Sequence, residues 1–153
     1  MAAAPIEFTL NGQATSLQVD TDRTLLDVLR NTLGLKGSRL GCGLGQCGAC
    51  TVILGDHAVT ACDTPMWSVA GKSVTTLEGL GTRQAPHPLQ AAFAREQALQ
   101  CGWCTSGMLM RAAALLQRDP RPAEADIKAA LEGNLCRCGV QNRVVRAVQK
   151  ACA

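Results

Sequence analysis

Aromatic and histidine side chains are scarce in this chain of 153 residues. It has no tyrosine, two phenylalanines, two tryptophans and two histidines. His57 lies just past an expected turn and His87 precedes a proline, so both are expected at the surface. A general base needs a specific partner within hydrogen-bond reach, and the sequence suggests none for either histidine. We therefore expect no catalytic residue in this chain.

Long apolar runs are also missing. Although 47% of the residues are hydrophobic, no run approaches the ~20 residues that a membrane-spanning helix needs. The N-terminal sequence has neither the basic n-region nor the apolar h-region of a signal peptide. We therefore expect a cytoplasmic chain without a membrane span. A partner that carries it across as a folded complex would place it in the periplasm or at the membrane.

The excess of charge is small. A net charge of +3 is too low to indicate a nucleic-acid-binding protein. Residues 1–80 hold five Lys or Arg against seven Asp or Glu, a net charge of −2, and residues 81–153 hold ten against five, a net charge of +5. A basic second half fits a phosphate-bearing cofactor or an acidic partner, and it fits solvated helix faces equally well.

Cysteine, in contrast, is abundant. Nine cysteines in a chain without a secretion signal favour metal ligation over a disulfide framework. Eight of them form two groups of four, and Cys152 remains as a spare thiol. The first set has the spacing C-x4-C-x2-C with a fourth cysteine after eleven residues, which is typical of a plant-type two-iron two-sulfur cluster. This first set is Cys42, Cys47, Cys50 and Cys62.

Glycines surround the first set. A cluster held by four thiolates carries negative charge, so backbone N–H donors around it are favourable. Gly41, Gly43, Gly45 and Gly48 allow the loop to wrap tightly enough to supply them. The alternatives are a zinc site and a disulfide-bonded loop. Zinc ligands favour C-x2-4-C pairs separated by a longer spacer, and they need no such density of glycine.

Residues 1–80 combine strand and helix patterns, which predicts an α+β unit. Asn11-Gly12 and Gly55-Asp56 are turn dipeptides between short apolar runs and predict two hairpins. Thr24 is expected to cap a helix that Gly34 ends. The expected strands are residues 6–10, 13–19, 51–54, 57–60 and 73–77. Trp67 is expected in the core.

The pattern changes after residues 80–88, which contain glycine and two prolines and are expected to form a linker. Apolar residues at helical spacing then predict a small four-helix domain, so we expect two domains, 1–80 and 81–153. The second helix is expected to be capped by Thr105-Ser106, with Met108 and Met110 as core filling. The expected helices are residues 89–99, 105–117, one carrying Ile127, Leu131 and Leu135, and 141–151.

The second set of cysteines is Cys101, Cys104, Cys136 and Cys138. Its C-x2-C and C-x-C pairs would meet if the intervening helices pack antiparallel. Spacing alone leaves a structural zinc site open. A thioredoxin-like redox pair fits less well, because that motif belongs to a βαβ pattern.

Four segments together resemble the iron-sulfur subunit of the molybdenum hydroxylases, the xanthine dehydrogenase and aldehyde oxidoreductase family. They are residues 41–50 with Cys62, 76–80, 100–108 and 133–139. The resemblance covers nearly the whole chain, and all eight cysteines fall on motif positions. It implies a plant-type ferredoxin-like β-grasp domain followed by an all-α four-helix domain, each holding one 2Fe-2S cluster.

The same resemblance implies residue roles. The first set would bind the outer cluster, with Gly43, Gly45 and Gly48 in the cluster loop, and the second set the inner one. The inner cluster would lie close to a molybdopterin held by a separate large subunit. Gln100 would hydrogen-bond that pterin, and Cys138 would also approach its edge.

Residues 134–139 resemble the flavin-free branch, which includes isoquinoline oxidoreductase, nicotinate dehydrogenase and bacterial membrane-associated aldehyde dehydrogenase. Many family members have proline where Ser106 stands and threonine where Gly139 stands. The branch typically passes electrons to cytochrome c. The implied function is transfer of electrons from a molybdenum site to an external acceptor, with aldehydes or N-heteroaromatics as substrates. Two other classes stay open: a free-standing ferredoxin-like carrier and a non-redox zinc module.

Overall fold

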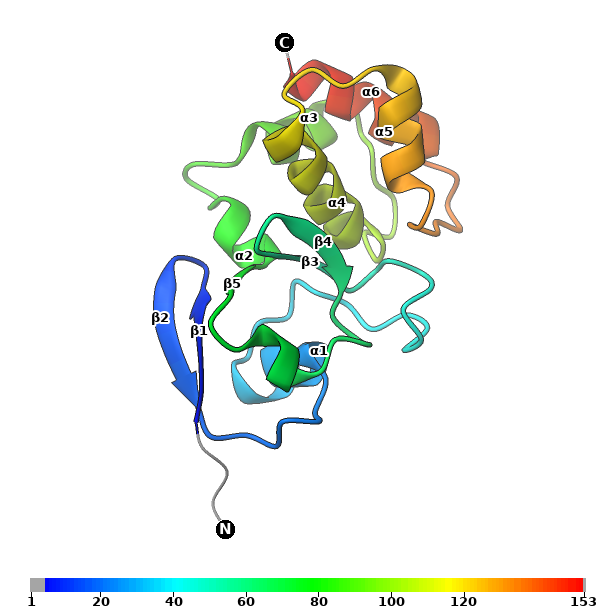
Figure 1. The fold of residues 1–153 in the computed structure, drawn as a ribbon. Helices are drawn as coiled ribbons and strands as arrows, with labels where there is room; N and C mark the ends of the chain where they lie inside the picture. The colour runs from blue at the N-terminus through cyan, green and yellow to red at the C-terminus, as the bar shows by residue number, and fades with distance from the viewer. Residues whose placement is uncertain (1–4, 153) are drawn as a thin grey trace.

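The computed structural model describes residues 5–152 and has a strand-rich half and a helical half (Figure 1). Residues 1–4, which belong to the N-terminal stretch considered for a signal peptide, and residue 153 lie outside the described part. The strand-rich half contains one five-stranded sheet in the order β2-β1-β5-β3-β4. Its strands are β1 (Ile6–Leu10), β2 (Gln13–Leu17), β3 (Thr51–Leu54), β4 (His57–Thr60) and β5 (Ser73–Thr75).

Both expected hairpins are confirmed. β1 pairs antiparallel with β2, and β3 pairs antiparallel with β4. Asn11 and Gly12 have φ values of 50° and 82°, as a tight hairpin turn requires. β1 also runs parallel to β5, which joins the two hairpins by pairing antiparallel with β3. The expectation of a strand over residues 73–77 is wrong at its end, because α2 (Leu77–Leu80) begins there.

The helix after β2 begins as expected. The hydroxyl of Thr24 accepts a hydrogen bond from the backbone N–H of Asp27 at 3.2 Å. The short α1 (Leu25–Asp27) continues directly as a π-helix, η1 (Val28–Thr32), and the buried side chains of both pack into the core of the strand-rich half.

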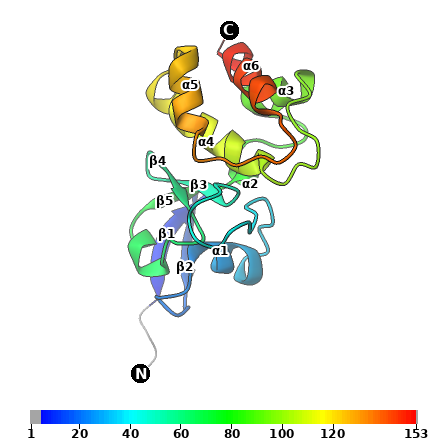
Figure 2. The same ribbon diagram turned by 90° about the vertical axis from the view of Figure 1, so that its right-hand side faces the viewer.

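Four helices form the other half and stack at one end of the sheet (Figure 2). They are α3 (Pro88–Arg95), α4 (Thr105–Arg118), α5 (Glu124–Leu131) and α6 (Gln141–Ala151), and a 3-10 turn, η2 (Met66–Val69), lies earlier in the chain. α3 ends before the expected residue 99, and Gln97 has a positive φ of 49°. Leu135 lies beyond α5 and is 64% exposed, so it does not continue that helix as expected. No helix within residues 5–152 is long and apolar enough to cross a bilayer.

Of three expectations about individual side chains, two are wrong and one is confirmed. Thr105 and Ser106 do not cap α4; they lie inside its first turn and are buried, and Cys104 holds the N-cap position. The sequence places Trp67 in the core, whereas its side chain is 60% exposed. Met108 and Met110 are fully buried, which confirms their assignment as core residues.

β3 is shared by both hydrophobic cores. Val52 packs with the core of the strand-rich half, and its neighbour Ile53 packs with the core of the helical half. Successive side chains of a strand point to opposite faces, so one short strand serves both cores. Because Cys50 immediately precedes β3, the first set is anchored at the boundary between the halves.

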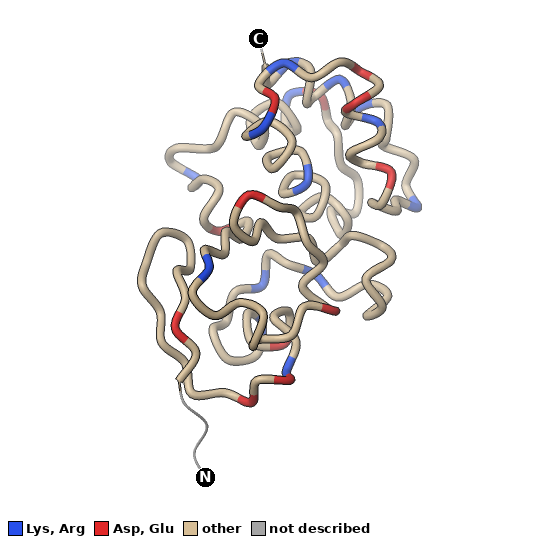
Figure 3. The backbone as a smooth tube through the Cα atoms, viewed as in Figure 1, with Lys and Arg blue, Asp and Glu red and all other residues tan. Residues whose placement is uncertain are grey.

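Charged side chains are common on the helical half (Figure 3). Glu96, just after α3, accepts from Lys150 at 2.6 Å and lies 3.5 Å from Arg146, both on α6. These contacts, led by the hydrogen bond from Lys150, hold the pKa of Glu96 below its ordinary value. Part of the basic character of the second half therefore stabilises helix packing.

Asn11 ties the first hairpin turn to the start of α2. Its Oδ1 accepts from the backbone N–H of Thr76 at 2.8 Å, and its Nδ2 donates to the Thr76 hydroxyl at 3.0 Å.

We expect Asn11→Ala to lower the free energy of unfolding by about 2 kcal/mol, because it removes both bonds and puts alanine at positive φ. Denaturant unfolding measures this. Asp56→Ala, in the exposed turn between β3 and β4, should stay within ~0.5 kcal/mol of the wild type. An equally small change for Asn11→Ala would contradict the assignment.

Candidate metal centres

Three members of the first set lie on the loop between η1 and β3, and the fourth, Cys62, follows β4. The backbone N–H groups of Leu44, Gln46 and Cys47 all donate to Cys42 Sγ at 3.3 Å. In addition, Gly45 N donates to Cys62 Sγ at 3.2 Å. The loop therefore directs its amides at sulfur, as a negatively charged cluster requires.

The thiols of the first set differ in acidity. The three backbone N–H groups lower the pKa of Cys42 to about 6. Burial raises the pKa of Cys50 to about 12, with Cys62 beside it. A thiolate at Cys42 is thus stabilised by the protein alone. A thiolate at the buried Cys50 requires a bound metal, because coordination to a cation deprotonates a thiol.

Two glycines of this loop sit where a side chain would collide. Gly45 and Gly48 have φ values of 70° and 72°. A Cβ on Gly45 would lie 2.2 Å from an Asp63 carboxylate oxygen, and one on Gly48 would lie 2.6 Å from the Gly133 carbonyl oxygen. Gly43 shares the positive φ, at 71°. Close approach of neighbouring segments thus explains Gly45 and Gly48, and the positive φ of the turns applies to all three glycines.

The second set gathers where α4 begins and where the chain turns before α6. The Sγ atoms of Cys101 and Cys138 lie 3.6 Å apart. Burial raises the pKa of Cys104 to about 12, and a hydrogen bond with Cys136 adds to this rise. The backbone N–H of Trp103 lowers the pKa of Cys101. Two short cysteine motifs more than thirty residues apart are therefore brought together.

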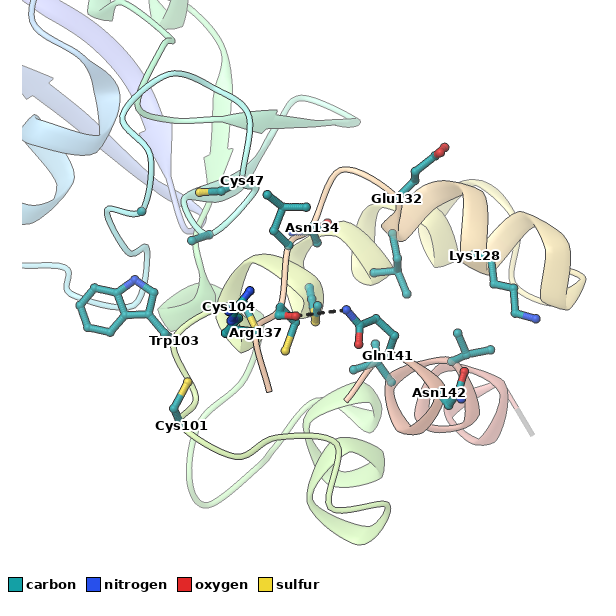
Figure 4. A pocket seen from close by; sticks show the side chains of 18 of the residues that line it. Cys47, Cys101, Trp103, Cys104, Lys128, Glu132, Asn134, Arg137, Gln141 and Asn142 are labelled. Carbon is teal, nitrogen blue, oxygen red and sulfur yellow. Dashed lines mark hydrogen bonds between the residues drawn. The ribbon is translucent and has the colours of Figure 1, made fainter. Parts of the chain in front are cut away.

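A cavity of about 770 Å³ lies between the two sets (Figure 4). Its lining includes Cys42 and Cys47 of the first set together with Cys101, Cys104 and Cys136 of the second. Both sets therefore face one space at the junction of the two halves.

Trp103 stands at the rim of this cavity and is 49% exposed. Its Nε1 donates to the carbonyl oxygen of Leu40 at 3.1 Å, and the Arg39 guanidinium lies 4.9 Å from the ring centroid. Gln100 lies beside the second set, where its Nε2 donates to the Cys138 carbonyl oxygen at 3.3 Å.

Direct hydrogen bonds join the two sets through the segment before Cys136. Leu135 N donates to the Cys47 carbonyl oxygen at 3.0 Å, and Asn134 Nδ2 donates to the Gly48 carbonyl oxygen at 3.0 Å. Asn134 Oδ1 is buried and has no hydrogen-bond partner. A Cβ on Gly107 would lie 2.0 Å from the Gly48 carbonyl oxygen.

Sequence patterns do not single out Asn134 and Gly107 as junction residues. Gly107 stands out only as a glycine inside a helical pattern, which often has a packing reason. Nothing in the local pattern around Asn134 indicates its partner 86 residues away.

The state of the thiols excludes one of the alternatives. All nine cysteines are free thiols, so the disulfide-bonded loop is excluded. Within residues 5–152, no three His, Cys, Asp or Glu side chains converge on a point suited to a single metal ion.

The protein has a ferredoxin-like sheet domain and a helical domain, and each contributes four free thiols at their junction. This arrangement defines the class of proteins with two iron-sulfur sites. Two family profiles agree with this class. The profile "2Fe-2S iron-sulfur cluster binding domain" matches residues 8–74, and "[2Fe-2S] binding domain" matches residues 76–149. The protein therefore binds two 2Fe-2S clusters.

Similar proteins identify the family. The chain is 50% identical over 146 residues to one of the subunits of nicotinate dehydrogenase from Pseudomonas putida, covering 95% of this chain and 93% of that one. It is 51% identical over 147 residues to the alpha subunit of isoquinoline 1-oxidoreductase from Brevundimonas diminuta, covering 95% and 96%. The solved aldehyde oxidoreductase from Desulfovibrio gigas superposes with a TM-score of 0.96 at 41% identity, over 99% of this chain and 17% of that one.

The chain belongs to the iron-sulfur subunits of the molybdenum hydroxylases. Two of these relatives, nicotinate dehydrogenase and isoquinoline 1-oxidoreductase, carry names of the branch that residues 134–139 indicated. Its role is electron transfer within a molybdopterin-dependent oxidoreductase, in which it is the non-catalytic subunit.

The acidity difference within the first set is testable on the metal-free chain. The thiolate is the species that reacts with iodoacetamide. Since the pKa of Cys42 is about 6, its alkylation rate should level off above about pH 7. Cys50, with a pKa of about 12 and 1% exposure, should stay unmodified. Mass spectrometry of peptides measures both. Cys152, whose pKa is raised by burial, is the control, and its rate should still rise at pH 9. A Cys42 rate that rises in parallel with that of Cys152 would contradict the assignment.

Proposed function

We propose that this chain carries electrons from the molybdenum site of a large subunit to an external acceptor such as cytochrome c. Cys42, Cys47, Cys50 and Cys62 hold the outer cluster of this proposal, and Cys101, Cys104, Cys136 and Cys138 hold the inner one. The observation that carries the proposal is the hydrogen bond from Leu135 N to the Cys47 carbonyl oxygen. It connects a residue next to one set directly to a member of the other.

A bound 2Fe-2S cluster takes up and releases one electron at a time. The chain's residues fit such a group. The amides aimed at Cys42 Sγ and Cys62 Sγ donate to sulfur, and donors to the sulfurs of a cluster are known to tune its potential. The loop glycines Gly43, Gly45 and Gly48 keep its turns free of side chains, which leaves room beside the thiols.

The position of Gln100 supports its proposed contact with the pterin. The residue is exposed, and its side chain bonds the backbone of Cys138, a partly exposed cysteine at the end of the second set. A pterin held by the large subunit would meet Gln100 and Cys138 together. In this proposal, residues 1–80 form the outer-cluster domain and residues 81–153 the inner-cluster domain.

The exposed apolar side chains fit a subunit that docks at both ends. Leu135 and Trp103 are exposed near the second set, and Leu44 is 70% exposed on the loop of the first. We assign the surface around Leu135 to contact with the large catalytic chain, and the tip around Leu44 to contact with the acceptor. We place the assembly in the cytoplasm, or in the periplasm where a partner carries it across in folded form.

The relatives suggest the substrate class. Their names specify nicotinate, isoquinoline and aldehydes. We therefore propose that the partner oxidises an N-heteroaromatic compound or an aldehyde, and the identities of about 50% favour the N-heteroaromatic class.

Purification of a tagged copy of the chain from its own cells tests the proposal. We expect it to co-purify with a larger, molybdenum-containing chain, and the complex to reduce cytochrome c on addition of nicotinate, isoquinoline or an aromatic aldehyde. A lone monomer that carries both clusters would support the free-standing ferredoxin-like carrier instead. A colourless, zinc-containing protein would contradict both.

A further inference from the structure

The loop of the first set is held to the helical half at its end, residues 47–49. Leu135 N and Asn134 Nδ2 donate to carbonyl oxygens there, both at 3.0 Å, and the Ser106 hydroxyl donates to a third at 3.5 Å. All three bonds reach the same short stretch of backbone. They would not by themselves fix the start of the loop, which carries Cys42.

Trp103 holds the start of the loop. Its Nε1 donates to the Leu40 carbonyl oxygen at 3.1 Å, two residues before the first cysteine of the set. The Arg39 guanidinium lies over the indole ring, 4.9 Å from its centroid, where the ring face attracts a cation. Within residues 5–152, no other hydrogen bond joins residues 36–46 to the part of the chain after residue 80.

Trp103 is also part of the second set's own motif, because it lies between Cys101 and Cys104 in the chain. Figure 4 shows Trp103 and Asn134 on opposite sides of Cys104. The two halves are therefore joined at two separate places, through residues 47–49 and through the indole. A segment held at two separate points cannot rotate about either one, so the loop is fixed in orientation as well as in position.

The indole contact acts on the separation between the two sets. Cys42 lines the same cavity as Cys101 and Cys104. A shift of the start of the loop would move Cys42 relative to both of them. Electron exchange between two clusters slows steeply as their separation grows. Functional groups therefore have to be held near the productive geometry by side chains that packing and hydrogen bonds fix in place.

We propose that Trp103 is a positioning residue for electron transfer between the two clusters. Its N–H and its ring hold the start of the loop, and with it Cys42, at a fixed distance from the second set. One electron leaves the cluster at the second set and enters the cluster at the first, and Trp103 acts on this step through the loop. This inference rests on the proposed assignment of the two sets as cluster ligands.

The experiment compares Trp103→Phe with the wild type, each as the full-length, cluster-loaded chain. Phenylalanine keeps an aromatic ring beside Arg39 and removes the N–H donor. Hydrogen exchange of the amides in residues 42–47 should become about fivefold faster, because loss of one hydrogen bond typically changes an opening equilibrium by about that factor. In the fully reduced chain, the mutual broadening of the two paramagnetic signals should weaken, with both clusters retained.

Trp67→Phe is the matched control. Trp67 is also exposed, and it does not line the cavity, so this variant should change neither measurement. Arg39→Met removes the cation over the ring and leaves the hydrogen bond from Trp103 in place. It should change both measurements in the same direction as Trp103→Phe, by a smaller amount.

The outcomes separate the inference from the function on which it rests. Unchanged exchange and unchanged broadening in a Trp103→Phe chain with both clusters would overturn the role of Trp103 and leave the proposed function standing. An equal change in Trp67→Phe would also overturn it, since general loosening and not the loop contact would then be responsible. If Trp103→Phe does not assemble, unchanged broadening in Arg39→Met overturns it. A wild-type chain without two cluster signals would overturn the proposed function itself.

Discussion

Cys42→Ser is expected to remove the outer cluster and to reduce steady-state turnover with the external acceptor by more than about a hundredfold. Loss of a residue that only supports a metal ligand typically costs ~10–100-fold, and loss of a ligand itself should cost more. Cys42 Sγ accepts three backbone N–H bonds, so the loop is built around that sulfur. A serine oxygen is a harder ligand, and soft thiolates are preferred for iron-sulfur clusters. The substrate should still reduce molybdenum and the inner cluster, because neither depends on Cys42.

Two measurements on the assembled enzyme check this result. Turnover with cytochrome c should be lost, and the paramagnetic signal of the inner cluster should still appear when substrate is added without air. Cys152→Ser is the control, because Cys152 belongs to neither set and its Sγ donates a hydrogen bond to the Val148 carbonyl oxygen. A Cys42→Ser enzyme with full steady-state activity would show that electrons leave by another route.

Gly107→Ala is expected to lower the free energy of unfolding by about 3 kcal/mol or more, at the upper end of the cost of overpacking. The added Cβ would lie 2.0 Å from the Gly48 carbonyl oxygen and 3.1 Å from the Ala49 Cα. Both are backbone atoms of the outer-cluster loop and cannot rotate away. The intrinsic gain of about 1 kcal/mol for alanine over glycine in a helix does not offset this collision.

Denaturant unfolding of the loaded protein measures the effect, and iron content shows whether the outer cluster is retained. Gly133→Ala is the control, because the nearest atom to its added Cβ is Arg111 Nη2 at 3.7 Å, an ordinary contact. Equal free energies of unfolding for the two variants would contradict the close packing of α4 against the loop.

Local features of the sequence predicted much of the fold. Asn11-Gly12 and Gly55-Asp56 indicated two hairpins because turn geometry depends on only a few neighbouring residues. The last helix was predicted at its observed bounds, since Val144, Val145 and Val148 mark one buried face. The spacing of the first set indicated a cluster for a similar reason, because the loop itself supplies three of the four thiols.

Features that depend on distant parts of the chain could not be predicted in this way. The end of β5 is set by Asn11, which binds Thr76 from 65 residues away. The role of Asn134 depends on Gly48, which lies 86 residues away in the chain. Thr105 and Ser106 looked like caps because their residue types favour helix starts, but packing against the cluster loop buries them inside α4.

Spin quantification of the anaerobically reduced, full-length chain tests the central claim most directly. Two clusters of two irons each give four iron atoms per chain. The account predicts four irons and two distinct paramagnetic signals that together integrate to two unpaired electrons, with mutual broadening because the two sets face one cavity. Zinc in place of iron, or a single signal with half that iron, would contradict it.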